Sequence, residues 1–301
     1  MAVHMTHDSS ALASLRGLAL GDALGAQFFV PDNLPHLADR RLPDGEWPWT
    51  DDTEMACVLH AELSLRGRVD QDALAREFAV RHDFDRGYGP STNRMLRLVR
   101  QGGDWRTLAA EPFDGQGSWG NGAAMRVAPL GAWFAADLDA VVEQAARSAE
   151  VTHTHPEGVA GAVAVAVAAA GAAILEQPEP ADLIAFARDR TPAGLVRQRL
   201  GAALELADRT DSRAVARTLG NGRLVSAPDT VPFAIWSAAR HLDDYAAAFW
   251  STASAGGDVD TTCAIVGGIV GVRAEPPAGW IRRVEALPTW WREVIEAARL
   301  K

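Results

Sequence analysis

Residues 158–175 read GVAGAVAVAVAAAGAAIL, eighteen positions without a charged side chain. A stretch of this length would suffice for a membrane span. However, Ala, Gly and Val are only weakly hydrophobic, and His155, Pro156 and Glu157 come directly before the stretch. A small-residue helix buried among other helices is therefore the better interpretation, and we expect no membrane association.

The same helix-forming character extends to both sides of this stretch. Ala, Leu, Arg and Glu dominate nearly every segment between Pro and Gly residues, and no segment shows the sustained period-two alternation of a half-buried strand. Asp211 with its neighbours, and Thr289, are expected helix caps. We predict helices over residues 12–26, 53–66, 70–82, 92–101, 138–150, 158–175, 181–188, 192–210, 212–219, 231–239, 242–254, 262–272 and 289–300.

The predicted fold class is all-α, with a single domain over residues 11–301 after a flexible N-terminus at 1–10. No linker rich in Pro, Gly or Ser divides the chain, and 301 residues can bury a sizeable core. The two longest irregular stretches are residues 28–49 and 102–122. Long loops in compact domains more often carry function than not, so both are candidate site segments.

Charge and cysteine content narrow the class of protein. There are 29 basic and 39 acidic residues, a net charge of −10, which argues against broad nucleic-acid binding. Cys57 and Cys263 form no disulfide framework, and the first ten residues lack a signal pattern, so a cytoplasmic location is expected. Lys301 is the only lysine and Ala is abundant, a composition that suggests a bacterial source with a GC-rich genome.

Two acidic clusters interrupt the apolar helices. The first is WTDDTE at residues 49–54, where Asp51 and Asp52 are adjacent and repel each other. One interpretation is a helix N-terminus with Thr50 as its cap and the acids near the positive end of the helix dipole. The second cluster, AGGDVDTT at residues 255–262, again places two aspartates beside threonines before an apolar helix. Mg²⁺ prefers such oxygen ligands, so together the clusters could hold one or two ions.

Five motifs along the chain carry a resemblance to one known family. They are GDALG at 21–25, TDDT at 50–53, GSWGNGAAMR at 117–126, THTHP at 152–156 and GGDVDT at 256–261. In this order they resemble the ADP-ribosylglycohydrolase family, which includes the enzyme that removes ADP-ribose from dinitrogenase reductase and the human hydrolases acting on ADP-ribosyl-arginine and ADP-ribosyl-serine. The resemblance covers almost the whole chain.

The resemblance implies a compact orthogonal all-α bundle with a binuclear magnesium site, for which Mn²⁺ is an alternative ion. The implied metal ligands are the oxygen donors of the two acidic clusters. Val259 stands where many members carry Thr, between the ligands rather than among them. The six implied ligands are Thr50, Asp51, Asp52, Asp258, Asp260 and Thr261.

The glycine-rich segment at residues 115–122 is either a flexible loop or a phosphate cradle, because exposed amides and a hydroxyl can bind a phosphate. The resemblance implies that it holds the diphosphate and ribose, with aromatic side chains as stacking or wall groups. It also implies that His153 contacts the substrate, with less support for His155. The implied ADP-ribose-binding residues are Phe113, Gly117, Ser118, Trp119, Gly120, Asn121, Gly122 and His153.

A third candidate is Asp85 in DRG at residues 85–87. Many family members carry an Asp-X-Gly element here, with the aspartate proposed as a general base or as a guide for the ribose. The alternative is a solvated turn, because Gly and Pro gather in this segment. With Asp51 and Asp52, Asp85 completes the candidate catalytic group.

One departure from the family concerns Phe29. Members usually carry a glutamate four residues after the last glycine of the first motif, where it contacts a metal or gates the site. Phe29 occupies that position, and the nearest loop carboxylates are Asp32 and Glu46. At this position the chain therefore has no carboxylate that could protonate a group or gate the site.

The leading hypothesis is a Mg²⁺-dependent hydrolase that cleaves the glycosidic bond at C1″ of an ADP-ribosyl group. Its partner would be ADP-ribose or an ADP-ribosylated substrate, and the chain would be a monomer or a small homo-oligomer. The alternatives are a non-hydrolytic ADP-ribose or nucleotide binder, which the change at Phe29 favours, and a hydrolase of a different nucleoside-linked ribose.

Overall fold

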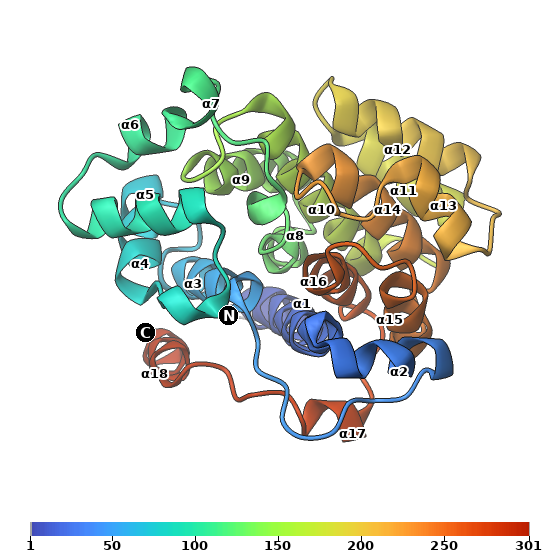
Figure 1. The fold of residues 1–301 in the computed structure, drawn as a ribbon. Coiled ribbons are helices and arrows are strands. Elements are labelled where there is room, and N and C mark those ends of the chain that lie inside the picture. The colour runs from blue at the N-terminus through green and yellow to red at the C-terminus, as the bar shows by residue number, and fades with distance from the viewer. Residues whose placement is uncertain (1, 301) are drawn as a thin grey trace.

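The computed structural model describes residues 2–300, with side chains from residue 7 onward, and they form helices without a single strand (Figure 1). Isolated bridges pair Trp47 with Val284 and Gly120 with Ser226. The all-α prediction is confirmed. The α-helices are α1 (Ala2–Ala26), α2 (Leu34–Asp39), α3 (Asp51–Arg66), α4 (Gln71–Arg81), α5 (Pro90–Arg100), α6 (Trp105–Ala110), α7 (Pro112–Gly115), α8 (Ala128–Trp133), α9 (Leu138–Glu150), α10 (Pro156–Ile174), α11 (Pro180–Arg190), α12 (Leu195–Glu205), α13 (Ser212–Leu219), α14 (Ala227–Arg240), α15 (Tyr245–Ala253), α16 (Val259–Val270), α17 (Ala278–Ile281) and α18 (Thr289–Arg299).

Helix α10 lies at the centre of the packing, against α8, α9, α11 and α14 (Figure 1). It is the one described helix long and apolar enough to cross a membrane, yet 78% of its apolar window is buried inside the fold. Its small side chains let neighbouring backbones approach closely: a methyl group on Gly131 of α8 would lie 2.0 Å from the carbonyl oxygen of Ala166. The predicted buried small-residue helix is confirmed.

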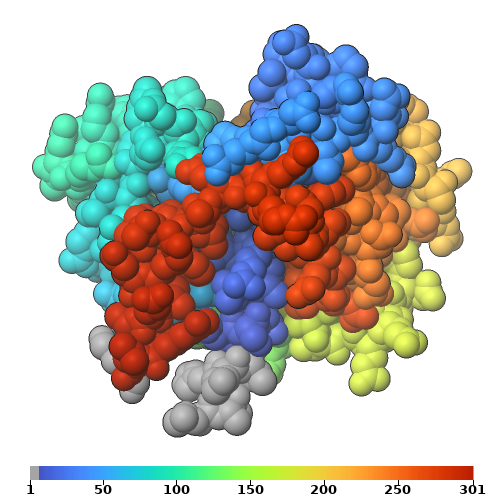
Figure 2. Space-filling model, turned by 90° about the horizontal axis from the view of Figure 1, so that it is seen from below, coloured from blue at the N-terminus to red at the C-terminus, as the bar shows by residue number. Residues whose placement is uncertain are grey.

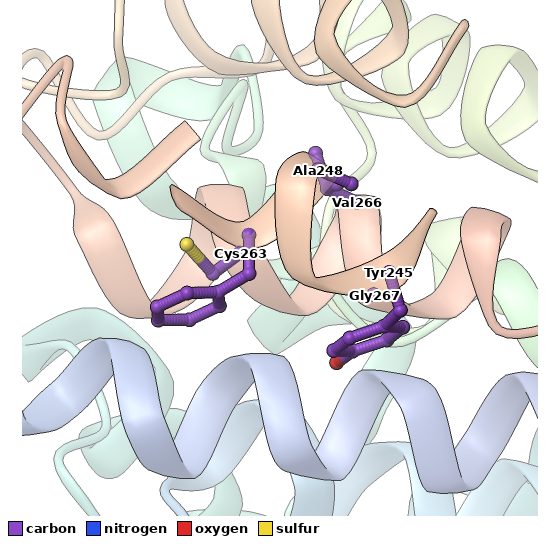
Figure 3. Close-up of a pocket in the computed structure, with 6 residues that line it drawn as sticks. Tyr245, Ala248, Cys263, Val266 and Gly267 are labelled. Atoms are coloured by element: carbon purple, nitrogen blue, oxygen red, sulfur yellow. The ribbon is translucent and has the colours of Figure 1, made fainter. Parts of the chain in front are cut away.

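Helices α1 and α16 cross in a second close contact, although they come from opposite ends of the chain (Figure 1). A β-carbon on Gly17 would lie 2.2 Å from the carbonyl oxygen of Gly267, and one on Gly21 would lie 2.0 Å from that of Cys263. Figure 3 shows Cys263 and Tyr245 lining a gap beside α1 that is too small for a water molecule. The Tyr245 hydroxyl donates to the Gly17 carbonyl oxygen at 2.5 Å. Glycines four residues apart on α1 therefore allow backbone-to-backbone packing of the two helices.

The N-terminal helix begins earlier than predicted. Helix α1 starts at Ala2 rather than at residue 12, so the described part of the expected flexible N-terminus is helical. Asp8 accepts from the Arg299 guanidinium at 2.8 Å, which ties the two ends of the chain together. Figure 2 shows the C-terminal segment, in red, flanking α1 on this face. The tertiary contact explains a helix that local sequence did not predict.

Several predicted boundaries need correction. The stretches 28–49 and 102–122 were expected to be irregular but contain α2, α6 and α7, and α8 was not predicted. Asp211 caps α13 as expected, through a hydrogen bond from the Ala214 amide, whereas Thr289 is the first residue of α18 and makes no capping bond. Helix α14 begins four residues before the predicted start and contains Pro232. The Pro228 carbonyl, which Pro232 leaves without its helical donor, accepts instead from Arg199 at 3.2 Å.

Candidate active site

Asp22, in the last part of α1, organises the start of α3. Its carboxylate is fully buried and accepts four hydrogen bonds, from the backbone amides and the hydroxyls of Thr50 and Thr53, at 2.5–3.1 Å. Three of the donors bond to Oδ2 and one to Oδ1, so Oδ1 keeps a lone pair that can face a cation. Asp22 is therefore an anchor for the N-terminus of α3. The predicted cap, Thr50, occupies the N-cap position, but its hydroxyl donates to the Asp22 and Asp52 carboxylates and accepts from no backbone amide of the helix.

The two acidic clusters meet beside this anchor, as the sequence predicted. Carboxylate oxygens of Asp22, Asp52 and Asp260 all lie within 4.8 Å of one another. Asp52 Oδ1 is buried and has no hydrogen-bond partner. A buried carboxylate oxygen without a partner is costly, because it has lost its hydration and gained nothing in return. A divalent cation is the ligand whose charge and preference for oxygen would satisfy it.

The electrostatics of the cluster also fit a cation. Burial raises the pKa of Asp51 to about 8, and the charge of Asp22 adds to the shift. Burial also raises the pKa values of Asp52 and Asp260 well above the ordinary range, and neighbouring carboxylates, Asp22 for Asp52 and Asp258 for Asp260, increase both shifts. These shifts mean that the carboxylates cannot all be ionised near neutral pH without positive charge among them.

Asp258 connects the carboxylate cluster to the glycine-rich segment. The Asn121 side-chain amide donates to Asp258 Oδ2 at 2.7 Å and to the Thr230 hydroxyl at 3.1 Å. Burial raises the pKa of Asp258, and hydrogen bonds with the Asn121, Asp260 and Thr261 side chains reduce the shift. The structure therefore joins the glycine-rich segment to the second acidic cluster through Asn121.

The glycine-rich segment is held in place along its length. Gly117 has a φ of +77°, and a β-carbon there would lie 2.0 Å from the Thr154 hydroxyl oxygen. Ser118 accepts from the Gly120 amide at 3.1 Å, and Trp119 accepts from the Ala227 amide at 2.9 Å. These contacts support a defined wall and not a loose connection.

His153 lies under this wall. A β-carbon on Gly122 would lie 2.9 Å from its ring, and one on Gly120 would lie 3.2 Å from Nε2. Its Nδ1 bonds to the Thr152 hydroxyl at 2.7 Å, while burial, helped by the charge of Arg126, lowers the pKa of His153 to about 3. His153 is therefore a neutral imidazole. His155 has a different task, because its Nδ1 accepts from the Glu157 amide at the start of α10.

Two aromatic side chains of the segment face solvent. Phe113 is 59% exposed and Trp119 is 46% exposed. Phe113 has a positive φ of 57°, which is strained for a residue with a β-carbon, and the Trp119 and His155 rings are 5.6 Å apart. Exposed aromatic rings beside a defined wall are suited to stacking on a planar ligand.

Asp85 is the one predicted catalytic residue outside the cluster. It is exposed, and its carboxylate makes no hydrogen bond or ion pair with any described residue. Its neighbours do reach the cluster: the Tyr88 hydroxyl and the Asp83 amide donate to Glu54 of α3, at 2.7 and 3.1 Å. The role of Asp85 stays a prediction.

Three positions that hold the site's residues in place were missed by sequence reasoning. Asp22 and Arg126 lie inside motifs that were recognised, but no role was assigned to them, and Glu54 was treated only as a helix-terminal acid. Arg126 is fully buried and donates to the Ser148 carbonyl and to the Thr152 hydroxyl, which in turn holds His153. The spacing of Gly17, Gly21 and Gly25 was the available signal, since it predicts a close helix crossing at Asp22.

The sequence pattern of one family, described as ADP-ribosylglycohydrolase, matches residues 4–301. The chain belongs to this family. It is 30% identical over 327 residues to "ADP-ribosylhydrolase ARH3" of Gallus gallus, over 90% of this chain and 88% of that protein. An uncharacterized protein of Archaeoglobus fulgidus is 33% identical over 281 residues, covering 88% of each chain. A solved structure described as an "ADP-ribosylglycohydrolase-related protein complex" superposes with a TM-score of 0.68 at 26% identity, covering 98% of this chain and 97% of that one.

These comparisons confirm the resemblance and the fold type expected from the five motifs. As an ADP-ribosylglycohydrolase family member, the chain is a hydrolase of glycosyl bonds, and the family supports activity on ADP-ribosyl groups in general. The buried aspartates provide a place where a metal ion could bind.

Proposed function

We propose that this protein is a Mg²⁺-dependent hydrolase that cleaves the glycosidic bond at C1″ of an ADP-ribosyl group and releases ADP-ribose. The observation that carries the proposal is the meeting of the two acidic clusters around the unpartnered Asp52 Oδ1, next to the glycine-rich wall. The acceptor that carried the ADP-ribose would be a protein, a nucleic acid or a small molecule.

The donor set fits hard divalent cations. Thr50, Asp51, Asp52, Asp258, Asp260 and Thr261 offer carboxylate and hydroxyl oxygens, the ligands that Mg²⁺ and Mn²⁺ take in proteins. We assign two ions to them. When bound, such ions would position the ribose hydroxyls and a water and would offset charge that develops in the reaction. Asp22 contributes by holding Thr50 and Thr53, which fixes the direction of the first cluster.

The glycine-rich wall supports a site for the rest of ADP-ribose. Its backbone turns and Ser118 suit a diphosphate, and the exposed Phe113 and Trp119 suit a planar base. Asn121 joins this wall to Asp258, so a ligand on the wall would have its ribose near the cluster. His153 supports the wall from below and remains neutral over the physiological pH range.

Proton transfer is assigned to the carboxylates. A metal-bound aspartate, Asp51 or its neighbour Asp52, would exchange a proton with the water that the ions position. Asp85 is the alternative: it lies in the exposed segment that bonds to Glu54 through its neighbours. Comparing the pH profiles of kcat for Asp51→Asn and Asp85→Asn would separate the two assignments.

A panel of ADP-ribosylated compounds tests the proposal. Arginine-, serine- and nucleobase-linked ADP-ribose and an ADP-ribosyl ester are incubated with the protein in Mg²⁺ or in EDTA, and free ADP-ribose is measured. We expect release from at least one compound in Mg²⁺ and none in EDTA. Asp208→Asn, at an exposed position remote from the cluster in sequence, is the matched control for Asp52→Asn. Equal release by Asp52→Asn and the wild type would contradict the proposal.

The second candidate is a non-hydrolytic ADP-ribose binder, and Phe29 favours it. Phe29 is 53% exposed in the turn after α1, at the position where the family usually carries a glutamate. Measurable ADP-ribose binding with no EDTA-sensitive release from any compound would support this candidate. Release of ribose from an unrelated nucleoside in the same assay would instead support the third possibility, a hydrolase with only the metal site in common.

A further inference from the structure

A second pocket lies away from the carboxylate cluster, between the end of α4, the turn η3 (Phe84–Arg86) and helix α5. Its volume is about 480 Å³, and it is lined by His82, Phe84, Asn93 and three arginines of α5. Ligand sites commonly have volumes of about 300–1,000 Å³. This pocket is therefore large enough for a small organic molecule and much larger than a bare ion needs. Figure 1 shows α4 and α5 side by side on the flank opposite α13.

The arginines are Arg94, Arg97 and Arg100, three residues apart, so they lie on one side of α5. No carboxylate lines the pocket. Arg94 is neutralised by Glu111, at 2.8 Å. The remaining two guanidinium groups leave two positive charges in the pocket of a protein whose net charge is −10. Such a concentration of one sign favours an anion of charge −2.

The three arginines differ in what holds them. Arg100 donates to the Ala79 and His82 carbonyls at the end of α4, at 2.6 and 2.7 Å, so it is fixed and stabilises the fold. Arg97 is exposed, and its guanidinium makes no hydrogen bond or ion pair with any residue that the structure describes. No described contact of the fold accounts for an arginine at 97. Its unpaired guanidinium is planar and can donate two parallel N–H hydrogen bonds to two oxygens of one phosphate.

The other walls add a flat apolar surface. Phe84 is 72% exposed at the edge of the pocket. His82 and Asn93 are already bonded to each other at 2.6 Å, and Asn93 also donates to the Tyr88 carbonyl at 2.6 Å. They therefore serve as a rigid wall, and Arg97 is the arginine whose donors are free. A ligand with a planar ring can stack on Phe84 while its anion reaches the arginines.

We propose that this arginine pocket binds a phosphoryl group attached to a planar ring, the chemistry of a nucleoside phosphate. The phosphoryl dianion matches the two free positive charges, and its three outer oxygens can accept from more than one guanidinium, which a carboxylate can do less well. The proposal goes beyond the proposed hydrolase function, because it uses none of the metal ligands or the glycine-rich wall. It can hold or fail independently of that function.

Binding of phenyl phosphate, followed by the broadening of its proton NMR signals in EDTA and low salt, tests the pocket. EDTA removes divalent ions, so the carboxylate cluster repels the probe. We expect saturable binding to the wild type and at least a tenfold loss in Arg97→Glu. Arg217→Glu is the matched control, since Arg217 is exposed on α13 and has no described partner; its affinity is expected within twofold of wild type. Equal binding by the wild type and Arg97→Glu would overturn the proposal.

Two further comparisons test the parts of the ligand. Phe84→Ala is expected to weaken phenyl phosphate at least threefold and to leave inorganic phosphate unchanged, because only the former has a ring. An equal effect on both would overturn the ring assignment. Benzoate is expected to bind at least tenfold more weakly than phenyl phosphate, and equal affinity would overturn the phosphoryl assignment.

Discussion

The carboxylate cluster and the glycine-rich wall touch through the 2.7 Å bond from Asn121 to Asp258, yet they are built in opposite ways. Asp22 and Asp52 are buried and depend on a helix crossing between the two ends of the chain. Phe113 and Trp119 of the wall are half-exposed and depend on local turns. Changes in the cluster should therefore alter stability, metal binding and turnover together, whereas changes on the wall should alter only substrate affinity.

The largest expected effect belongs to the cluster. Asp260→Asn should lower kcat by about 1,000-fold, because a lost metal ligand removes several kcal/mol of transition-state stabilisation. Steady-state kinetics in Mg²⁺ would measure it, with Asp208→Asn as the exposed control. A change confined to KM would mean that the cluster, like the wall, only binds substrate.

The next effect tests the helix crossing itself. Gly21→Ala should lower the free energy of unfolding by about 3 kcal/mol, since its methyl group would lie 2.0 Å from the Cys263 carbonyl oxygen. Gly201→Ala on α12 is the matched control: nothing lies within 4 Å of its added methyl, and it should stabilise by about 0.5–1 kcal/mol. Urea unfolding would measure both. Equal effects would show that the crossing tolerates a wider spacing.

A pH effect should distinguish the two regions in the metal-free protein. Burial raises the pKa of Asp51 to about 8, so the folded state binds a proton that the unfolded state has released, and stability falls as pH rises toward 8. Burial lowers the pKa of His153 to about 3, so below pH 6.5 the unfolded state binds a proton that the folded state does not. His153 therefore makes stability rise with pH, but only below about pH 6.5.

Between pH 6.5 and 8, therefore, the buried carboxylates change the stability with pH and His153 does not. Thermal unfolding in EDTA should show a loss of stability of at least about 1.5 kcal/mol over this range, the share of Asp51 alone. Asp51→Asn should reduce the slope and leave the part that Asp52 and Asp260 contribute, since burial raises their pKa values too, whereas Trp119→Ala should leave the slope intact. A stability that rises with pH over this range in the wild type would contradict the described electrostatics.

The smallest effect belongs to the wall. Trp119→Ala should raise KM for an ADP-ribosylated substrate about tenfold through lost stacking. Its effect on kcat should stay within about threefold, because the Trp119 contact to Ala227 uses backbone atoms that Ala also has. Steady-state kinetics would test this. A collapse of kcat at unchanged KM would show that the wall takes part in the chemistry.

The sequence predicted the fold class and the parts of the site that rest on local patterns. The charge-free stretch at 158–175 predicted a buried helix, and the paired aspartates with threonines predicted that residues 50–52 and 258–261 would act together. The two acidic clusters meet only because α1 and α16 cross, and local helix propensity does not determine that crossing. For this reason Asp22 was missed as an anchor, although the glycine spacing on α1 was visible.

The remaining errors have a common cause in tertiary contacts. Helix α1 extends to Ala2 where Asp8 meets Arg299, and α14 continues through Pro232 because Arg199 satisfies the freed carbonyl. Neither partner lies near in sequence. The arginine pocket went unnoticed for a similar reason: arginines three residues apart are an ordinary solvated helix face until Phe84 and His82 close a pocket around them.

The central claim is that the buried carboxylates form a divalent metal site. The most direct test is a titration of Mn²⁺ against the metal-free protein, with free Mn²⁺ counted by electron paramagnetic resonance. We predict two bound ions per chain in the wild type, and fewer than one in Asp52→Asn, whose fold is checked by circular dichroism. Equal Mn²⁺ binding by the wild type and a folded Asp52→Asn would contradict the claim.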